Sequence, residues 1–243
     1  MNFIFGDGNN KNYGKNWITC DWNNSDINMY FTYGSKFPIQ DNSIELIYTS
    51  HVIEHMKDDV VEELFKEFKR ILKPYGYIRI VAPDIEAYIN SYKTEKKEKF
   101  YVEEYGVGSG RTWYQEVLYC ANKGYCTIQL TEIQNLLCLM MCSYIDKPND
   151  GVLFNKVEVD EKLKELNIDD FIKWVTSHYN FNRPGGHCNG FYPNKVIRML
   201  DSLNFKNCEN KNFRESNIIE IITNPNLDLE LRKTISFYVE AQK

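Results

Sequence analysis

The chain has 243 residues, of which 43% are apolar and 26% charged, and its formal net charge is −5. This composition is ordinary for a globular protein with a substantial core. The acidic balance disfavours nucleic acid as a partner, because proteins that bind the phosphate backbone usually carry a basic face.

Short strands are expected in the first part of the chain, each an apolar run bounded by turn residues. They cover residues 2–6, 16–22, 28–32 and 44–50. The first runs into the turn Gly6-Asp7-Gly8, and the second ends at Asp21. The fourth is apolar along most of its length, as a central parallel strand should be.

The clearest helix in the sequence follows the fourth strand. Apolar residues recur at helical spacing from Val60 to Leu72, and Pro74 and Gly76 are expected to end the helix. Residues 77–84 then form a fifth strand. Strand, helix and strand in succession predict a parallel pair joined by a right-handed crossover.

Residues 85–190 have a different pattern, with helical segments, many aromatic residues and no alternation of strands with helices. Helices are expected there at 85–106, 131–145 and 160–179. Beyond this region we expect a helix at 192–205 and strands at 206–213 and 234–243. The fold class is therefore α/β, a Rossmann-like, doubly wound, mostly parallel sheet with a helical insertion after the fifth strand. We interpret 1–243 as a single domain in which 85–190 covers the substrate.

Residues suited to binding a ligand fall at the ends of the parallel strands. Gly6 and Gly8 end the first strand, Asp21 the second, and Ser50-His51 the fourth. Ligands of such sheets bind at the carboxyl edge of the strands. Glycines let backbone N–H groups approach a ligand, and a carboxylate after the second strand can accept both hydroxyls of a ribose.

The segments "WITCDW", "FPIQDNSIELIYTSHVIEHM" and "RILKPYGYIRIVAPD" resemble the class I S-adenosylmethionine-dependent methyltransferases. The resemblance is to the bacterial methyltransferase type 11-like group. It covers residues 2 to about 90 and resumes at "GHCNGFYPNKVIRMLDSLNF" and "SFYVEAQK". The sequence departs from the family after the expected third strand, where an acidic residue near the adenine is missing. It departs again at Tyr75, which stands where the family has a glycine.

The resemblance implies S-adenosylmethionine as the cofactor and assigns roles to the residues at the strand ends. The glycine turn would approach the methionine part, Asp21 would hold the ribose, and Ser50 and His51 would border cofactor and acceptor. The implied cofactor-binding residues are Gly6, Asp7, Gly8, Asp21, Trp22, Ser50 and His51.

The stretch "SHVIEHM" also matches H-x-x-E-H, a zinc-protease pattern formed here by His51, Glu54 and His55. A zinc hydrolase is therefore an alternative. Such enzymes carry the motif within a long helix and need a further ligand. Here His51 directly follows a strand, a new helix begins at Asp58, and no third ligand is evident. We therefore expect no metal site.

Methyl transfer often requires a base for the proton of the acceptor. The candidates are His187, in the glycine-rich segment "RPGGHCNGF", His51 at the end of the fourth strand, and Asp84 at the end of the fifth. Histidine titrates near neutrality, and His187 is favoured marginally because its segment joins the insertion to the sheet.

The predicted function is methyl transfer from S-adenosylmethionine to a small or carbohydrate-linked acceptor. The resemblance to the methyltransferase family implies a role in surface-polysaccharide biosynthesis. The alternative is a non-catalytic binding module or partner subunit that keeps the cofactor fold. A signal peptide and a membrane span are not expected, and seven cysteines without a framework spacing indicate reduced thiols and a cytoplasmic location. The sequence gives no indication of the oligomeric state.

Overall fold

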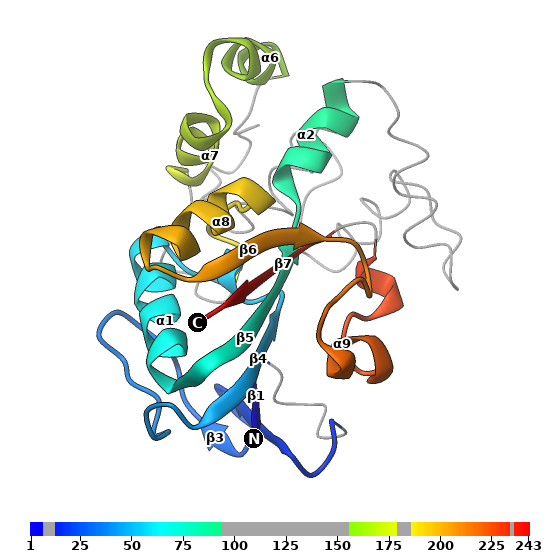
Figure 1. Cartoon of the computed structure of the whole chain (residues 1–243). Coiled ribbons are helices and arrows are strands. Elements are labelled where there is room, and N and C mark those ends of the chain that lie inside the picture. Colours follow the sequence, from blue (N-terminus) through cyan, green and yellow to red (C-terminus); the bar gives the residue numbers. More distant parts are fainter. Residues whose placement is uncertain (7–12, 94–155, 179–185, 234–235) are drawn as a thin grey trace. The chain divides into compact units, whose positions relative to one another are not determined.

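The computed structural model describes residues 1–6, 13–93, 156–178, 186–233 and 236–243 (Figure 1). The chain divides into two compact units. Unit 1 consists of Met1–Ile53, Lys57–Pro83 and Phe191–Lys243, and unit 2 of Glu54–Met56 and Asp84–Gly190.

The described part of unit 1 contains a seven-stranded sheet with the order β3-β2-β1-β4-β5-β7-β6. Its strands are β1 (Asn2–Phe5), β2 (Trp17–Asp21), β3 (Ile27–Asn28), β4 (Ile44–Ser50), β5 (Leu72–Pro83), β6 (Lys206–Lys211) and β7 (Ser236–Gln242). Neighbours from β3 to β5 are parallel, and β7 is antiparallel to both β5 and β6. The order is that of a doubly wound sheet with β7 inserted between β5 and β6, which confirms the predicted α/β fold.

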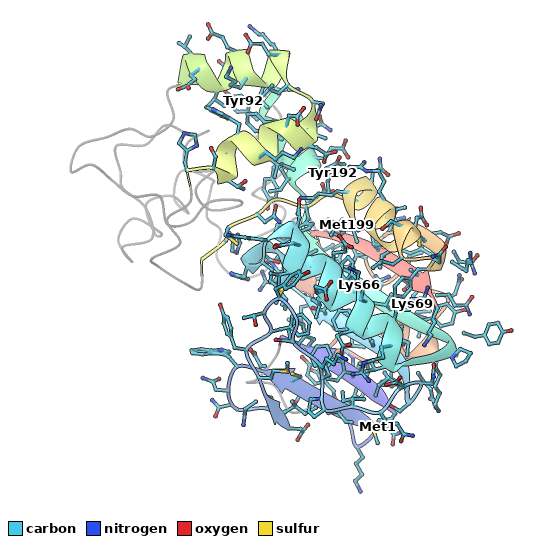
Figure 2. The ribbon with its side chains drawn as sticks, turned by 90° about the vertical axis from the view of Figure 1, so that its left-hand side faces the viewer. Met1, Lys66, Lys69, Tyr92, Tyr192 and Met199 are labelled. Carbon is cyan, nitrogen blue, oxygen red and sulfur yellow. The ribbon has the colours of Figure 1, made fainter. Side chains whose placement is uncertain are left out.

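Helices cover both faces of this sheet (Figure 1). On one face lie α1 (Asp58–Ile71) and α8 (Pro193–Ser202), and on the other lies α9 (Ile219–Thr223). Figure 2 shows Lys69 on α1 and Met199 on α8. The Lys69 ammonium donates to the carbonyl oxygens of Leu203 and Asn204, directly after α8, and so ties the two helices together. The 3-10 helix η2 (Glu230–Arg232) also belongs to unit 1, whereas η1 (Ile53–His55) has its last two residues in unit 2.

Aromatic rings fill the space between the sheet and α1. Phe3 and Phe5 of β1 lie 5.0 and 5.4 Å from the ring of Phe37, measured between centroids, and Phe37 stacks on Phe68 of α1 at 5.8 Å. All four side chains are buried. Burial of such large apolar rings is the main stabilising contribution to this layer.

A charged cluster is buried in the sheet around Arg79 of β5, whose side chain is 0% exposed. Its guanidinium forms an ion pair with Asp228 and another, at 2.7 Å, with Glu240 of β7. It also donates to the carbonyl oxygen of Glu215 at 3.1 Å. The Tyr48 hydroxyl accepts from the Asp228 N–H at 2.8 Å. These bonds attach the segment between β6 and β7 to the centre of the sheet.

The described part of unit 2 includes α2 (Ile85–Lys93), α6 (Lys156–Glu165) and α7 (Ile168–Thr176). Tyr92, labelled in Figure 2, donates from its hydroxyl to Asp160 at 2.7 Å and so joins α2 to α6. Val159, Phe171 and Val175 are buried. In the part of the chain that the structure describes, no helix is long and apolar enough to cross a membrane.

Several boundaries differ from those expected. The helix predicted over 160–179 is divided into α6 and α7, because Asn167 caps α7 by accepting from the Asp170 N–H at 3.0 Å. The helix expected at 85–106 is described only as far as Lys93, and the one at 131–145 lies outside the described residues. The third strand has only two residues, and α9 was not predicted.

The fifth strand begins at Leu72 rather than at residue 77, and α1 accordingly ends before Pro74. The cause is an irregularity in the pairing with β4, where Ile44 is opposite Leu72 but Leu46 is opposite Tyr77. Tyr75, within this bulge, is 78% exposed and has a φ of 65°. Glycine adopts this left-handed conformation without strain, whereas a residue with a side chain such as Tyr75 adopts it at a cost.

Candidate functional site

Three of the expected cofactor residues lie side by side at the carboxyl edge of the sheet in unit 1. Phe5 is opposite Cys20 on one side and Thr49 on the other. The next residue, Gly6, donates its N–H to the Cys20 oxygen at 2.8 Å. Gly6 therefore lies between Asp21 and Ser50. Asp7 and Gly8 are outside the described residues.

Gly6 is required by its conformation and by its neighbour. Its φ is +93°, and a Cβ atom built on it would lie 1.9 Å from the Val52 Cγ2 atom. A larger residue would be strained in its backbone and would displace Val52, which follows His51. A glycine is therefore needed at position 6 because the turn after β1 closely approaches Val52, after β4. This contact is apparent only in the folded chain.

Gly6→Ala is expected to destabilise the protein by roughly 1–3 kcal/mol, the typical cost of overpacking. Urea unfolding followed by circular dichroism measures this change. In the double variant Gly6→Ala/Val52→Ala the contact is relieved, so part of the loss should be recovered, while the strain of the positive φ remains. An unchanged unfolding midpoint for Gly6→Ala would contradict this account.

The loop after β2 holds Asp21 and Trp22 in defined positions. The Asp21 N–H donates to the Ser25 hydroxyl at 3.0 Å, and the Trp22 N–H donates to Asp21 Oδ1 at 2.6 Å. Trp22 is 69% exposed. A carboxylate beside an exposed aromatic ring at this edge fits a ribose and its attached base. Tyr30 and Tyr33, exposed after β3, add aromatic surface that the sequence analysis did not single out.

His51 is held by two side chains from the distant end of unit 1. Its Nδ1 atom lies 2.8 Å from Arg232 Nη1 and its Nε2 atom 2.7 Å from the Ser236 hydroxyl. A guanidinium can only donate, so Nδ1 accepts and the proton is on Nε2. The residue also has a φ of 56°, a conformation that needs support from its surroundings. To act as a base, His51 would first have to release Arg232.

Asp84 directly follows β5 and begins α2. Its Oδ1 atom accepts from the Ala87 N–H at 3.1 Å, which makes it a helix cap. Burial raises the pKa of this carboxyl to about 6, against the smaller opposing effect of the bond from Ala87. A carboxyl group with this pKa can exchange a proton near neutrality.

The remaining candidates meet in a group within unit 2 that we call the Glu54–His55–His187 cluster. One ligand atom from each side chain lies within 4.8 Å of the others. His187 Nε2 is 4.0 Å from Glu54 Oε1, and the two imidazole rings are nearly perpendicular with centroids 4.7 Å apart. Glu54 is 1% exposed. The three residues of the H-x-x-E-H match therefore have different partners. His51 bonds to Arg232 and Ser236 in unit 1, whereas Glu54 and His55 lie beside His187 in unit 2.

Comparison with known proteins gives a match over residues 12–80 to the family described as "Methyltransferase domain". This range includes Asp21, Trp22, Ser50 and His51. No curated protein matches the chain.

Three solved structures of S-adenosylmethionine-dependent methyltransferases are similar. The one from Archaeoglobus fulgidus has 13% identity and a TM-score of 0.33, covering 84% of this chain and 62% of that chain. The one from Mesorhizobium loti has 11% identity and a TM-score of 0.40, covering 99% and 89%. The one from Methanosarcina mazei has 11% identity and a TM-score of 0.44, covering 99% and 91%. The chain thus spans about three fifths of the length of the Archaeoglobus protein.

The matched range contains the second and fourth strands together with the residues that end them. The sheet order and the adjacency of Gly6, Asp21 and Ser50 are those of a doubly wound sheet with a ligand-binding carboxyl edge. Residues 12–80 are thus similar to the methyltransferase-domain family, and the described sheet has the doubly wound order expected from the sequence.

Proposed function

We propose that the protein transfers a methyl group from S-adenosylmethionine to a small or carbohydrate-linked acceptor. The observation that supports this most directly is the placement of Gly6, Asp21 and Ser50 on three adjacent strand ends. The match of residues 12–80 to a methyltransferase domain supports the same activity.

The residues at this edge fit the cofactor in charge and shape. Bound S-adenosylmethionine supplies an electrophilic methyl group on a positively charged sulfur. The Asp21 carboxylate would accept from the ribose hydroxyls, and the exposed ring of Trp22 would cover the adenine, which compensates for the missing acidic residue after β3. The backbone of Gly6 would border the methionine part. His51, fixed by Arg232 and Ser236, would shape the loop between cofactor and acceptor.

Of the three expected base candidates, Asp84 has the chemistry that best suits the task. Its raised pKa and its place directly after β5 support a role in removing the acceptor's proton. We propose that residues 85–190 cover the acceptor. Resemblance supports a glycan acceptor in surface-polysaccharide biosynthesis, and seven cysteines without a framework spacing support a cytoplasmic location. No nucleic-acid partner is proposed, in keeping with the net charge of −5.

Asp21→Ala is expected to weaken binding of S-adenosylhomocysteine by roughly 10- to 150-fold. The reason is the loss of charge-assisted hydrogen bonds to the ribose, worth about 1.5–3 kcal/mol. Isothermal calorimetry measures the affinity. Glu45→Ala is the matched control, because it removes a carboxylate from the amino end of β4, where it pairs with Lys73 at the surface. Equal affinity of Asp21→Ala and the wild type would refute the assignment.

The acceptor is sought by measuring transfer of a labelled methyl group to a panel of sugars, sugar nucleotides and small hydroxylated compounds. Transfer to a sugar-containing compound would support the glycan proposal, and transfer only to another compound would replace it. Normal binding of S-adenosylhomocysteine without transfer to any acceptor would favour the alternative, a binding module that retains the cofactor fold.

A further inference from the structure

We infer that Glu54, His55 and His187 form a binding site for a divalent transition-metal ion such as Zn²⁺. The three side chains come from two segments far apart in the sequence and place their ligand atoms within 4.8 Å of one another. This inference goes beyond the proposed methyl transfer, and it depends on neither the cofactor nor the acceptor.

The donor set has the chemistry that such ions prefer. Two imidazole nitrogens and one carboxylate oxygen are ligands for Zn²⁺ and related ions, and three protein ligands leave a fourth position open. Tetrahedral ligands at 2.0–2.2 Å from an ion are roughly 3.3–3.6 Å apart. His187 Nε2 and Glu54 Oε1 are 4.0 Å apart, so small rotations of the side chains would bring this pair to that separation.

The backbone around the cluster holds the two segments together without an ion. The Glu54 carbonyl oxygen accepts from the N–H groups of Cys188 and Asn189, at 2.8 and 3.2 Å. The Asn189 side chain donates to the Met56 carbonyl oxygen at 3.0 Å. Because these bonds involve residues next to the ligands, the geometry of the site is largely formed before binding.

Charge favours the same conclusion. Glu54 is 1% exposed, and a divalent ion is attracted more strongly to a carboxylate in such a place than to one in water. Neutral imidazoles complete the donor set of the ion without adding charge. His55 is exposed and His187 partly exposed, which gives an ion access from solvent.

The experiment uses the full chain after treatment with a chelator. Zn²⁺ is titrated by isothermal calorimetry, and Co²⁺ is added to a second sample to follow the absorption bands of a tetrahedral complex. The wild type is expected to bind about one ion per chain. His55→Asn and His187→Asn should each weaken binding by at least ~100-fold, since even the loss of residues that merely orient ligands costs 10- to 100-fold.

His178→Asn is the matched control, because His178 is another histidine of unit 2 whose ring is bonded to the Trp174 carbonyl oxygen at 2.9 Å, outside the cluster. Its binding should equal that of the wild type. No binding to the wild type, or unchanged binding in His55→Asn and His187→Asn, would overturn the inference. Because His55 is exposed, His55→Asn is expected to remain folded, and its melting temperature without metal checks this.

Affinity for S-adenosylhomocysteine, measured on His55→Asn, separates this inference from the proposed function. Unchanged cofactor affinity together with lost metal binding is the expected result. Absence of metal binding with normal cofactor binding would overturn the metal site and leave methyl transfer standing. With an ion bound, His187 serves as a ligand, which leaves Asp84 and His51 as the candidates for the base.

Discussion

Replacing Arg79 by Met is expected to lower the free energy of unfolding by about 3–5 kcal/mol, the typical cost of removing one partner from a buried ion pair. The side chain is 0% exposed and neutralises both Asp228 and Glu240. Methionine has a similar length but leaves two buried carboxylates without their cation. Chemical unfolding followed by circular dichroism measures the change.

Lys73→Met provides the control for this substitution. Lys73 pairs with Glu45 at 2.6 Å, but both side chains are about half exposed, so the loss should be at most ~1 kcal/mol. The triple variant Arg79→Met/Asp228→Asn/Glu240→Gln should recover part of the stability, because the uncompensated charges are gone. If Arg79→Met unfolds at the same urea concentration as the wild type, the buried cluster does not have the structural role assigned to it.

Asp84→Asn is expected to reduce the rate of methyl transfer by ~10²–10⁴-fold, the usual contribution of general-base catalysis. Asparagine can still cap α2 but cannot accept a proton. Affinity for S-adenosylhomocysteine should be unchanged. The measurement is turnover under saturating cofactor with an acceptor identified from the panel. Full turnover in Asp84→Asn would place the base elsewhere, with His187 and His51 as the next candidates.

The pH profile gives a separate test of Asp84. Its pKa is raised to about 6 from an ordinary value near 3.8, so the carboxylate that acts as base predominates only above that pH. The wild-type rate should therefore fall as the pH decreases through about 6. In Asp84→Asn this inflection should be absent. A purely structural role as a helix cap would lower the rate of the variant without removing the inflection.

Much of unit 1 could be predicted because its signals are local. The strand at 44–50 is an apolar run whose predicted bounds coincide with β4, and the apolar spacing from Val60 to Ile71 predicts the buried stripe of α1. The convergence of Gly6, Asp21 and Ser50 follows from the geometry of parallel strands, since their carboxyl ends share one edge. Each of these inferences needs only a few consecutive residues and one general rule.

The contacts that could not be predicted join residues distant in the sequence. Neither Arg232 nor Ser236 carries a motif, so their bonds to His51 are apparent only in the folded chain. His187 lies in a glycine-rich segment of the sequence, but its approach to Glu54 depends on how the polypeptide returns after the insertion. Likewise, β5 begins earlier than predicted because of a bulge in its pairing with β4. Such a bulge depends on both strands, so it cannot be read from one segment of sequence.

The position of β7 beside β5 also constrains how the protein folds during synthesis. Arg79 of β5 and Glu240 of β7 bond across 161 positions of sequence. At ~5–20 residues per second, the ribosome needs on the order of 10–30 s to make the intervening chain. Throughout that interval β5 has no partner on one side, and its backbone N–H and C=O groups can pair with a strand of another nascent chain. We expect chaperones to be most needed in this interval, and the completion of residues 236–242 to end it.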